Sequence, residues 1–140
     1  MSDEKTQSVD RLADPSALGL FGLAVITLVA CTQKFGITDG VTGVMSWAIF
    51  LGGCMQLIAG VFDFKKNNVF GGTAFIAYGF FWCAMAFSWA VTSGIFGEQA
   101  AAAFDPKQTG VAFLAYLILT AFMTIGALRT TKVLFLIFLA

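Results

Sequence analysis

The 140-residue sequence contains no histidine, three cysteines and few charged residues. Without histidine, neither a Ser/His/Asp triad nor a Cys/His pair can form. Cys31, Cys54 and Cys83 lie in separate apolar segments without CxxC spacing, so we expect neither a metal site nor a disulfide. No phosphate-binding glycine loop and no paired carboxylates occur in the apolar segments. These absences argue against an enzyme, and we expect no cofactor.

Charge is balanced as well as scarce. Eight basic and eight acidic residues together make up 11% of the chain, so a broad basic face is excluded and nucleic acid is not an expected partner. Hydrophobic residues make up 59%, and the mean hydropathy is +0.86. A soluble core built from so short a chain cannot bury this much apolar surface. The composition therefore indicates a membrane protein, with the lipid bilayer as its surroundings.

Four apolar runs come close to or exceed the roughly 20 residues that a helix needs to cross a bilayer. They predict spans over about 17–33, 41–62, 69–96 and 109–128. A fifth run, 133–140, is too short to span, so we expect the chain to be cut within a helix unless this run folds back at the interface. The fold class predicted is an all-α membrane protein, a polytopic helix bundle with a transmembrane domain over 17–140.

The basic residues of the connections are distributed unevenly across the predicted membrane. Those on the side of the N-terminus are Lys5, Arg11, Lys65, Lys66, Arg129 and Lys132, against Lys34 and Lys107 on the other side. The positive-inside rule then places the polar tail, residues 1–16, in the cytoplasm of a multi-pass protein of the cell membrane. This tail carries no cleavage pattern, so we expect it to be retained.

Ionisable side chains are nearly absent from the interior of the predicted spans. Lys34, Asp39, Asp63 and Arg129 fall at span ends, where we expect them to reach water. Buried carboxylates commonly mark proton or ion relays. Their absence favours a passive path or weak coupling without excluding coupling.

The uncharged stretch "NNVFGGTAFIAYGFFW", residues 67–82, opens the third span, which has two distinct faces. At about 100° per residue, one face carries Ala74, Tyr78, Trp82, Met85, Trp89 and Thr92. The other carries small residues suited to helix packing: Gly72, Gly79, Cys83, Ala86 and Ala90. The aromatic face either lines a pathway or fills protein core or lipid interface, and the spacing leaves both open.

Polar residues in the spans allow similar alternatives. Gln56 needs a partner within the second span, from another helix or from passing solvent. Thr120 and Thr124 in the fourth span either line a pathway or bond their own backbone. Asn67 or Asn68 can cap the third helix, and Gly71 can then either expose N–H groups to an anion or simply pack.

The segments "GGCMQLIAGVFDF" and "NVFGGTAFIAYGFFW", with "DPSALGL" before the first span, resemble the acetate uptake transporter family. This family includes bacterial succinate-acetate permeases and fungal acetate and ammonia-export proteins. The resemblance covers residues 14–140. In the first motif the family positions are Asp14, Pro15, Leu18, Gly19 and Leu20, with Asp14 where the family has Asn. Two further departures are Asp63, where Glu is usual, and Asn67, where Gly is usual.

The resemblance implies a six-helix protomer, of which this chain supplies four complete helices and an incomplete fifth, assembled as a homohexamer. Each protomer would be a channel or permease that passes acetate or a related small carboxylate, with succinate as one candidate, through a hydrophobic constriction. Tyr78 carries over to this constriction, and Leu23 takes the position of the family's Phe. Candidates for the rest of the substrate pathway are Gln56, Asn68, Gly71, Thr73, Phe75, Trp82, Thr120 and Thr124.

Two alternatives accompany this interpretation. Lys34 shares a helical face with Leu23 and Thr27, so it either attracts anions to the outer mouth or is an ordinary snorkelling lysine. The chain as a whole is alternatively a non-transporting membrane assembly protein or an inactive, truncated remnant.

Overall fold

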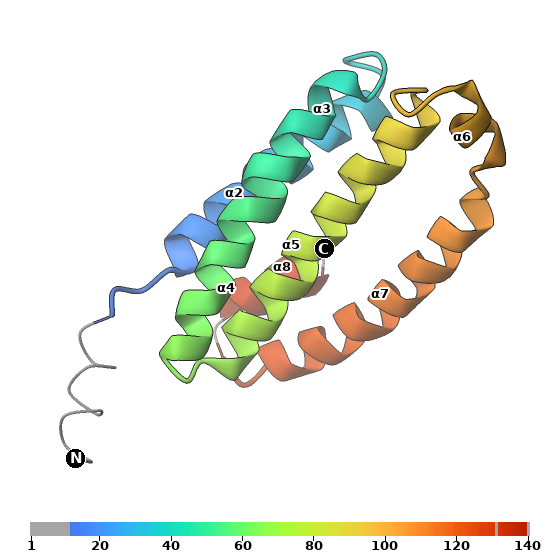
Figure 1. Cartoon of the computed structure of the whole chain (residues 1–140). Helices are drawn as coiled ribbons and strands as arrows, with labels where there is room; N and C mark the ends of the chain where they lie inside the picture. The colour runs from blue at the N-terminus through green and yellow to red at the C-terminus, as the bar shows by residue number, and fades with distance from the viewer. Residues whose placement is uncertain (1–11, 131, 140) are drawn as a thin grey trace. The chain divides into compact units, whose positions relative to one another are not determined.

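The computed structural model describes residues 12–130 and 132–139, so most of the predicted N-terminal tail lies outside the described residues. The helices are α2 (Ser16–Lys34), α3 (Thr42–Trp47), the π-helix η1 (Ala48–Met55), α4 (Gln56–Lys65), α5 (Val69–Thr92), α6 (Glu98–Ala103), α7 (Pro106–Ala127) and α8 (Lys132–Leu139) (Figure 1). No strand occurs in the described residues. The prediction of an all-α protein is confirmed.

Four of these helical segments are long and apolar enough to cross a membrane. They are α2, the continuous segment Thr42–Lys65 formed by α3, η1 and α4, and the helices α5 and α7. Each matches one predicted span, which confirms the prediction of four complete spanning helices. The chain divides into two compact units, residues 1–102 and 103–140.

The first unit packs α2, the Thr42–Lys65 segment and α5 against one another (Figure 1). Its buried cluster comprises Ile26 from α2, Val44 and Ala48 from the second segment, and Ala86 from α5. Glycines bring the backbones together: a side chain at Gly79 would lie 3.1 Å from Leu57, and any Cβ at Gly22 would overlap the Leu51 carbonyl oxygen. Small residues thus take the contact positions, as is typical of helices that pack in membranes.

The π-helix η1 is a feature that the sequence pattern did not reveal. Its wider turn lies where the second segment meets both α2 and α5. Gly52 faces Ile26 and Trp82, and Gly53 faces Cys83. π-Helical turns are uncommon and often accompany functional sites. Here η1 contacts two other helices, α2 and α5, and hydrophobic periodicity does not report such contacts.

Local chemistry sets the helix boundaries. Asn68 caps α5 by accepting a hydrogen bond from Gly71 N–H at 3.1 Å, and Asn67 before it has a φ of +60°. This left-handed conformation favours glycine and tolerates asparagine, which explains how Asn67 replaces the usual Gly. At its other end α5 stops at Thr92 and not at residue 96, because Gly94 adopts a φ of +79°.

The second unit contains α7 and α8. Asp105 caps α7 by accepting a hydrogen bond from Lys107 N–H at 2.9 Å, so the helix begins at Pro106, before the predicted residue 109. The short run predicted as an incomplete fifth span forms α8, which packs against α7. A hydrogen bond of 3.1 Å from the Thr124 hydroxyl to the Phe138 carbonyl joins the two helices.

Candidate functional site

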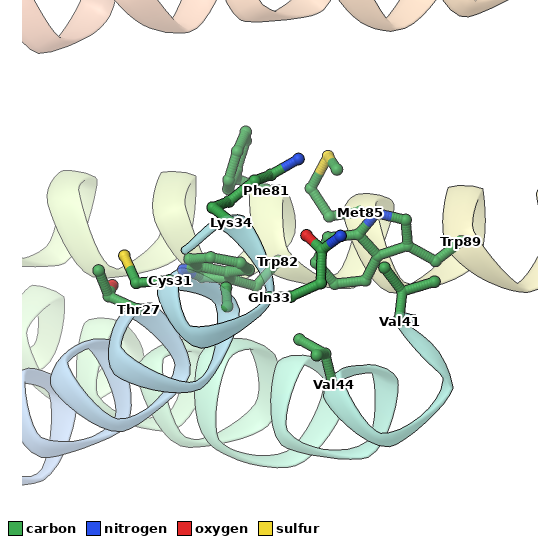
Figure 2. Close-up of a pocket in the computed structure, with 11 residues that line it drawn as sticks. Thr27, Cys31, Gln33, Lys34, Val41, Val44, Phe81, Trp82, Met85 and Trp89 are labelled. Carbon is green, nitrogen blue, oxygen red and sulfur yellow. The ribbon is translucent and has the colours of Figure 1, made fainter. Parts of the chain in front are cut away.

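A cavity of about 200 Å³ lies in the first unit between α2, the start of α3 and α5 (Figure 2). Its lining residues are Thr27, Ala30, Cys31, Gln33, Lys34, Val41, Val44, Phe81, Trp82, Met85 and Trp89. Pockets for drug-sized ligands measure about 300–1,000 Å³, so this cavity suits a smaller molecule. It is therefore the candidate site for a small solute.

Helical periodicity brings these side chains together. On α5, Trp82, Met85 and Trp89 recur every three or four residues and so lie on one face, which is the predicted aromatic face. Trp82 is held by an edge-on contact with Phe81, with ring centroids 5.4 Å apart. On α2, Thr27 and Lys34 lie two turns apart on a common face. The walls are mainly apolar, with few polar groups.

The polar lining groups come mainly from the last turns of α2. Thr27 contributes a hydroxyl, Gln33 an amide and Lys34 an ammonium group, and Lys34 is exposed. Figure 2 shows Lys34, Phe81 and Met85 on the side of the cavity opposite Val44. An exposed lysine at a helix C-terminus keeps its hydration and favours anions at that end of the cavity. The exposed position of Lys34 fits both alternatives, a lysine that attracts anions and an ordinary snorkelling lysine.

The predicted constriction residues, Leu23 and Tyr78, each lie one helical turn before a residue that lines the cavity. Leu23 and Tyr78 are half-buried, and neither lines the cavity itself. Leu23 precedes Thr27 by four residues, and Tyr78 precedes Trp82 by four. Since α2 and α5 run in the same direction (Figure 1), both residues lie about 6 Å further along the same faces, away from Lys34. The two faces thus continue past the cavity toward the predicted neck.

Gln56 is fully buried where η1 passes into α4. Its amide group donates a hydrogen bond of 2.8 Å to the Gly52 carbonyl, one turn earlier in the same segment. The other amide atom, Oε1, has no hydrogen-bond partner among the described residues. Gln56 does not line the cavity, although its partner Gly52 contacts the cavity residue Trp82.

The N-cap and the first two turns of α5 contain four pathway candidates, none of which lines the cavity. The Asn68 side chain caps the helix by accepting a hydrogen bond from the Gly71 N–H, so this N–H is not available to an anion. Phe75 is buried, and its ring lies where a side chain at Gly19 would be. Thr73 is half-buried. The predicted packing positions lie in contacts between helices. Gly72 faces Phe64. Three of the positions are buried, Gly72, Gly79 and Ala86, and Cys83 is half-buried.

The expectation that Asp63 reaches water is wrong. Asp63 is 1% exposed, because the turn after α4 folds the end of that helix onto the first turn of α5. The Asn68 side chain hydrogen-bonds the Asp63 carboxyl group, whose Oδ2 has no hydrogen-bond partner among the described residues. The inference of a passive path from a lack of buried carboxylates therefore loses its basis. Lys34, Asp39 and Arg129 are exposed as expected.

The first family motif forms the start of α2. The exposed Asp14 carboxylate accepts hydrogen bonds from Ser16 N–H at 3.0 Å and from the Ser16 hydroxyl at 2.7 Å. These bonds lower the pKa of Asp14. Pro15 and Gly19 are buried, Leu20 is half-buried and Leu18 is exposed.

The threonine candidates belong to the second unit. The Thr120 hydroxyl donates to the Tyr116 carbonyl at 2.7 Å, and the Thr124 hydroxyl donates to the Thr120 carbonyl at 2.8 Å as well as to Phe138. Both hydroxyls thus bond backbone carbonyls. In the described part of the chain, no group of three potential metal ligands occurs. All three cysteines are free.

Comparison with known proteins places these features in a family. The profile of the GPR1/FUN34/yaaH family matches residues 2–140. The chain is 39% identical over 77 residues to the succinate-acetate/proton symporter SatP of Escherichia coli, a match covering 54% of this chain and 40% of that protein. It is 32% identical over 145 residues to acetate permease A of Emericella nidulans, covering 96% of this chain and 48% of the permease.

A solved structure gives the same result for the fold. The structure of the bacterial acetate channel SatP matches with a TM-score of 0.82 and 30% identity, over 92% of this chain and 69% of that one. The chain thus matches less than half the length of the two curated relatives. The family resemblance predicted from the motifs is confirmed.

Proposed function

Because this chain belongs to the GPR1/FUN34/yaaH family, we propose that it carries acetate and related small carboxylates, including succinate, across the cell membrane. The cavity between α2, α3 and α5 is the observation that supports this proposal most. It is small, its walls are mainly aromatic and aliphatic, and its one lysine is exposed at its mouth. The relatives include a succinate-acetate/proton symporter and an acetate permease.

The proposed path starts at Lys34, which raises the local concentration of anions without holding them firmly. The solute then exchanges water for the Thr27 hydroxyl and the Gln33 amide of the cavity. Neutral donors bind a carboxylate more weakly than a buried lysine or arginine would. Weak binding matters because a conducted solute has to leave the site as readily as it enters.

From the cavity, the path continues to a hydrophobic neck at Leu23 and Tyr78. Both residues lie one turn beyond the cavity on the faces that line it, which supports their assignment to one neck. Leucine in place of the family's phenylalanine makes the neck wider without making it polar. Within the first unit, we assign Gln56, Thr73 and Phe75 as further pathway residues. The Thr120 and Thr124 hydroxyls of the second unit bond backbone carbonyls, which fits the alternative role given for them.

The proposed assembly is a homohexamer with the N-terminus in the cytoplasm, in which each protomer has its own path. The excess of basic residues on the N-terminal side of the spans supports this orientation. No catalytic role is assigned.

Uptake of radiolabelled acetate into proteoliposomes tests the proposal. The wild-type chain is expected to take up acetate faster than protein-free liposomes. Tyr78→Ala is expected to change the uptake rate or the ratio of acetate to succinate uptake, because it removes one side of the neck. Phe80→Ala is the matched control, since Phe80 lies on the same helix and is 59% exposed.

Two results would contradict this account. Uptake equal to that of protein-free liposomes would favour the alternative of a non-transporting assembly protein or an inactive remnant. Unchanged rate and selectivity in Tyr78→Ala, with wild-type uptake intact, would show that Tyr78 only packs.

A further inference from the structure

Asp63 is a buried carboxyl group that the proposed path does not use. It lies at the end of α4 and is 1% exposed. Its backbone carbonyl accepts hydrogen bonds from Lys66 N–H at 3.0 Å and from Asn68 N–H at 2.9 Å, which fix the turn into α5. The side chain is therefore held against the first turn of α5.

The contacts of the carboxyl group itself are incomplete. The Asn68 side chain provides one hydrogen bond. Oδ2 lies against Gly71, where any Cβ would overlap it, and finds no hydrogen-bond partner among the described residues. Only glycine at position 71 leaves room for the carboxyl group in this place.

Two charged groups act on Asp63 from the neighbouring segments. Asp14, from the segment before α2, repels a negative charge there, and Lys66, from the turn after α4, attracts it. Among the described residues, α5 presents the neutral Asn68 amide and the Gly71 backbone to this carboxyl group. Hydrogen bonds from Ser16 keep Asp14 in its charged form, so the repulsion persists.

An ionised carboxylate with an unpartnered oxygen in a buried site costs free energy, and binding a proton removes this cost. The proton would also remove the charge from the contact between the end of α4 and the start of α5. The helix α5 carries Tyr78 and Trp82, which line the proposed path. Protonation of Asp63 can therefore affect the residues of the proposed path through a single helix, α5.

We propose that Asp63 binds and releases a proton during carboxylate transport and thereby makes transport depend on pH. The inference rests on the proposed function of the chain. In the step itself, a proton from the aqueous phase adds to Asp63 and converts the carboxylate to the neutral carboxylic acid, and its release reverses the step. No other bond is made or broken.

The test measures acetate uptake over a range of pH together with proton entry, reported by a pH-sensitive dye inside the proteoliposomes. The wild type is expected to show pH-dependent uptake accompanied by protons. Asp63→Asn, which has a similar shape but cannot ionise, is expected to lose both the pH dependence and the proton flux. Asp39→Asn is the matched control, because Asp39 is exposed, and is expected to retain both.

A second variant covers the case in which Asp63→Asn does not fold. Asn68→Ser keeps an oxygen that can cap α5 but removes the amide that bonds Asp63. Its pH midpoint of uptake is expected to move from that of the wild type. Uptake and proton flux that keep the wild-type pH profile in Asp63→Asn, or an unmoved midpoint in Asn68→Ser, would overturn the assignment.

The failure of this inference is separable from failure of the proposed function. If the wild type takes up acetate but Asp63→Asn keeps its pH profile, the proton site is wrong and transport stands. If the wild type takes up no acetate at any pH, both proposals fail.

Discussion

Gly52→Ala tests the link between helix packing and the cavity, because Gly52 in η1 lies directly against the cavity residue Trp82. A Cβ at this position would lie 2.7 Å from Trp82 Cγ and 2.8 Å from Trp82 Cβ, against 3.4 Å for the shortest ordinary contact. These Trp82 atoms are close to its backbone, so they cannot swing away as the end of a flexible chain does. The new methyl group must therefore push Trp82, or separate η1 from α5.

The free energy of unfolding is expected to fall by about 1–3 kcal/mol, which is the usual cost of an extra methylene group in a packed core. The gain of about 0.5–1 kcal/mol from replacing a helical glycine by alanine offsets part of this loss. Gly43→Ala is the control, since Gly43 lies in α3 and a Cβ there would meet nothing within 4 Å. This control is expected to be neutral or slightly stabilising.

Unfolding of the purified variants in detergent measures the stability, and acetate uptake by the same preparations measures the effect on the cavity. Gly52→Ala is expected to be less stable than Gly43→Ala and to change uptake, because Trp82 moves. If the two variants have equal stability and equal uptake, the close approach of η1 to Trp82 does not shape the site as described.

Three further predictions concern single residues. Lys34→Gln is expected to slow acetate uptake at low ionic strength and to flatten its salt dependence, because a steering cation is removed; rates that match the wild type at every salt concentration would contradict this. Asn67→Gly is expected to stabilise the protein and Asn67→Val to destabilise it by about 1–2 kcal/mol in thermal unfolding, because the φ is +60°; the opposite order would count against the left-handed turn. The hydrogen bonds from Ser16 lower the pKa of Asp14, so their contribution to stability is complete above the usual pKa of 3.8 and is lost as the pH falls through the lower value of the folded state. Asp14→Ala should lack this acid-dependent loss, and acid unfolding curves that superimpose on those of the wild type would refute it.

The spanning helices could be predicted from the sequence because a bilayer imposes length and apolarity on each segment separately. The aromatic face of α5 could also be predicted, since helical phase places Trp82, Met85 and Trp89 together whatever they contact. The resemblance supplied the family. These features depend on local sequence alone.

The features that the sequence did not reveal depend on contacts between helices. The burial of Asp63 arises from the fold of the α4–α5 turn and from the space at Gly71. The sequence places Asp63 at the end of a predicted span, and this position alone predicts that its side chain reaches water. Likewise, the contribution of Cys31 and Val44 to the cavity required the relative placement of α2 and α3, which no periodicity encodes.

The most direct test of the proposed path uses Cys31, a free cysteine that lines the cavity. A small thiol-specific methanethiosulfonate reagent is applied to proteoliposomes during acetate uptake, with mass spectrometry to establish that Cys31 is modified and a Cys31→Ser variant as the control. If the cavity is the path, modification of Cys31 will reduce uptake, excess acetate will slow the modification, and Cys31→Ser will resist the reagent. Full uptake by protein whose Cys31 is completely modified would contradict passage through this cavity.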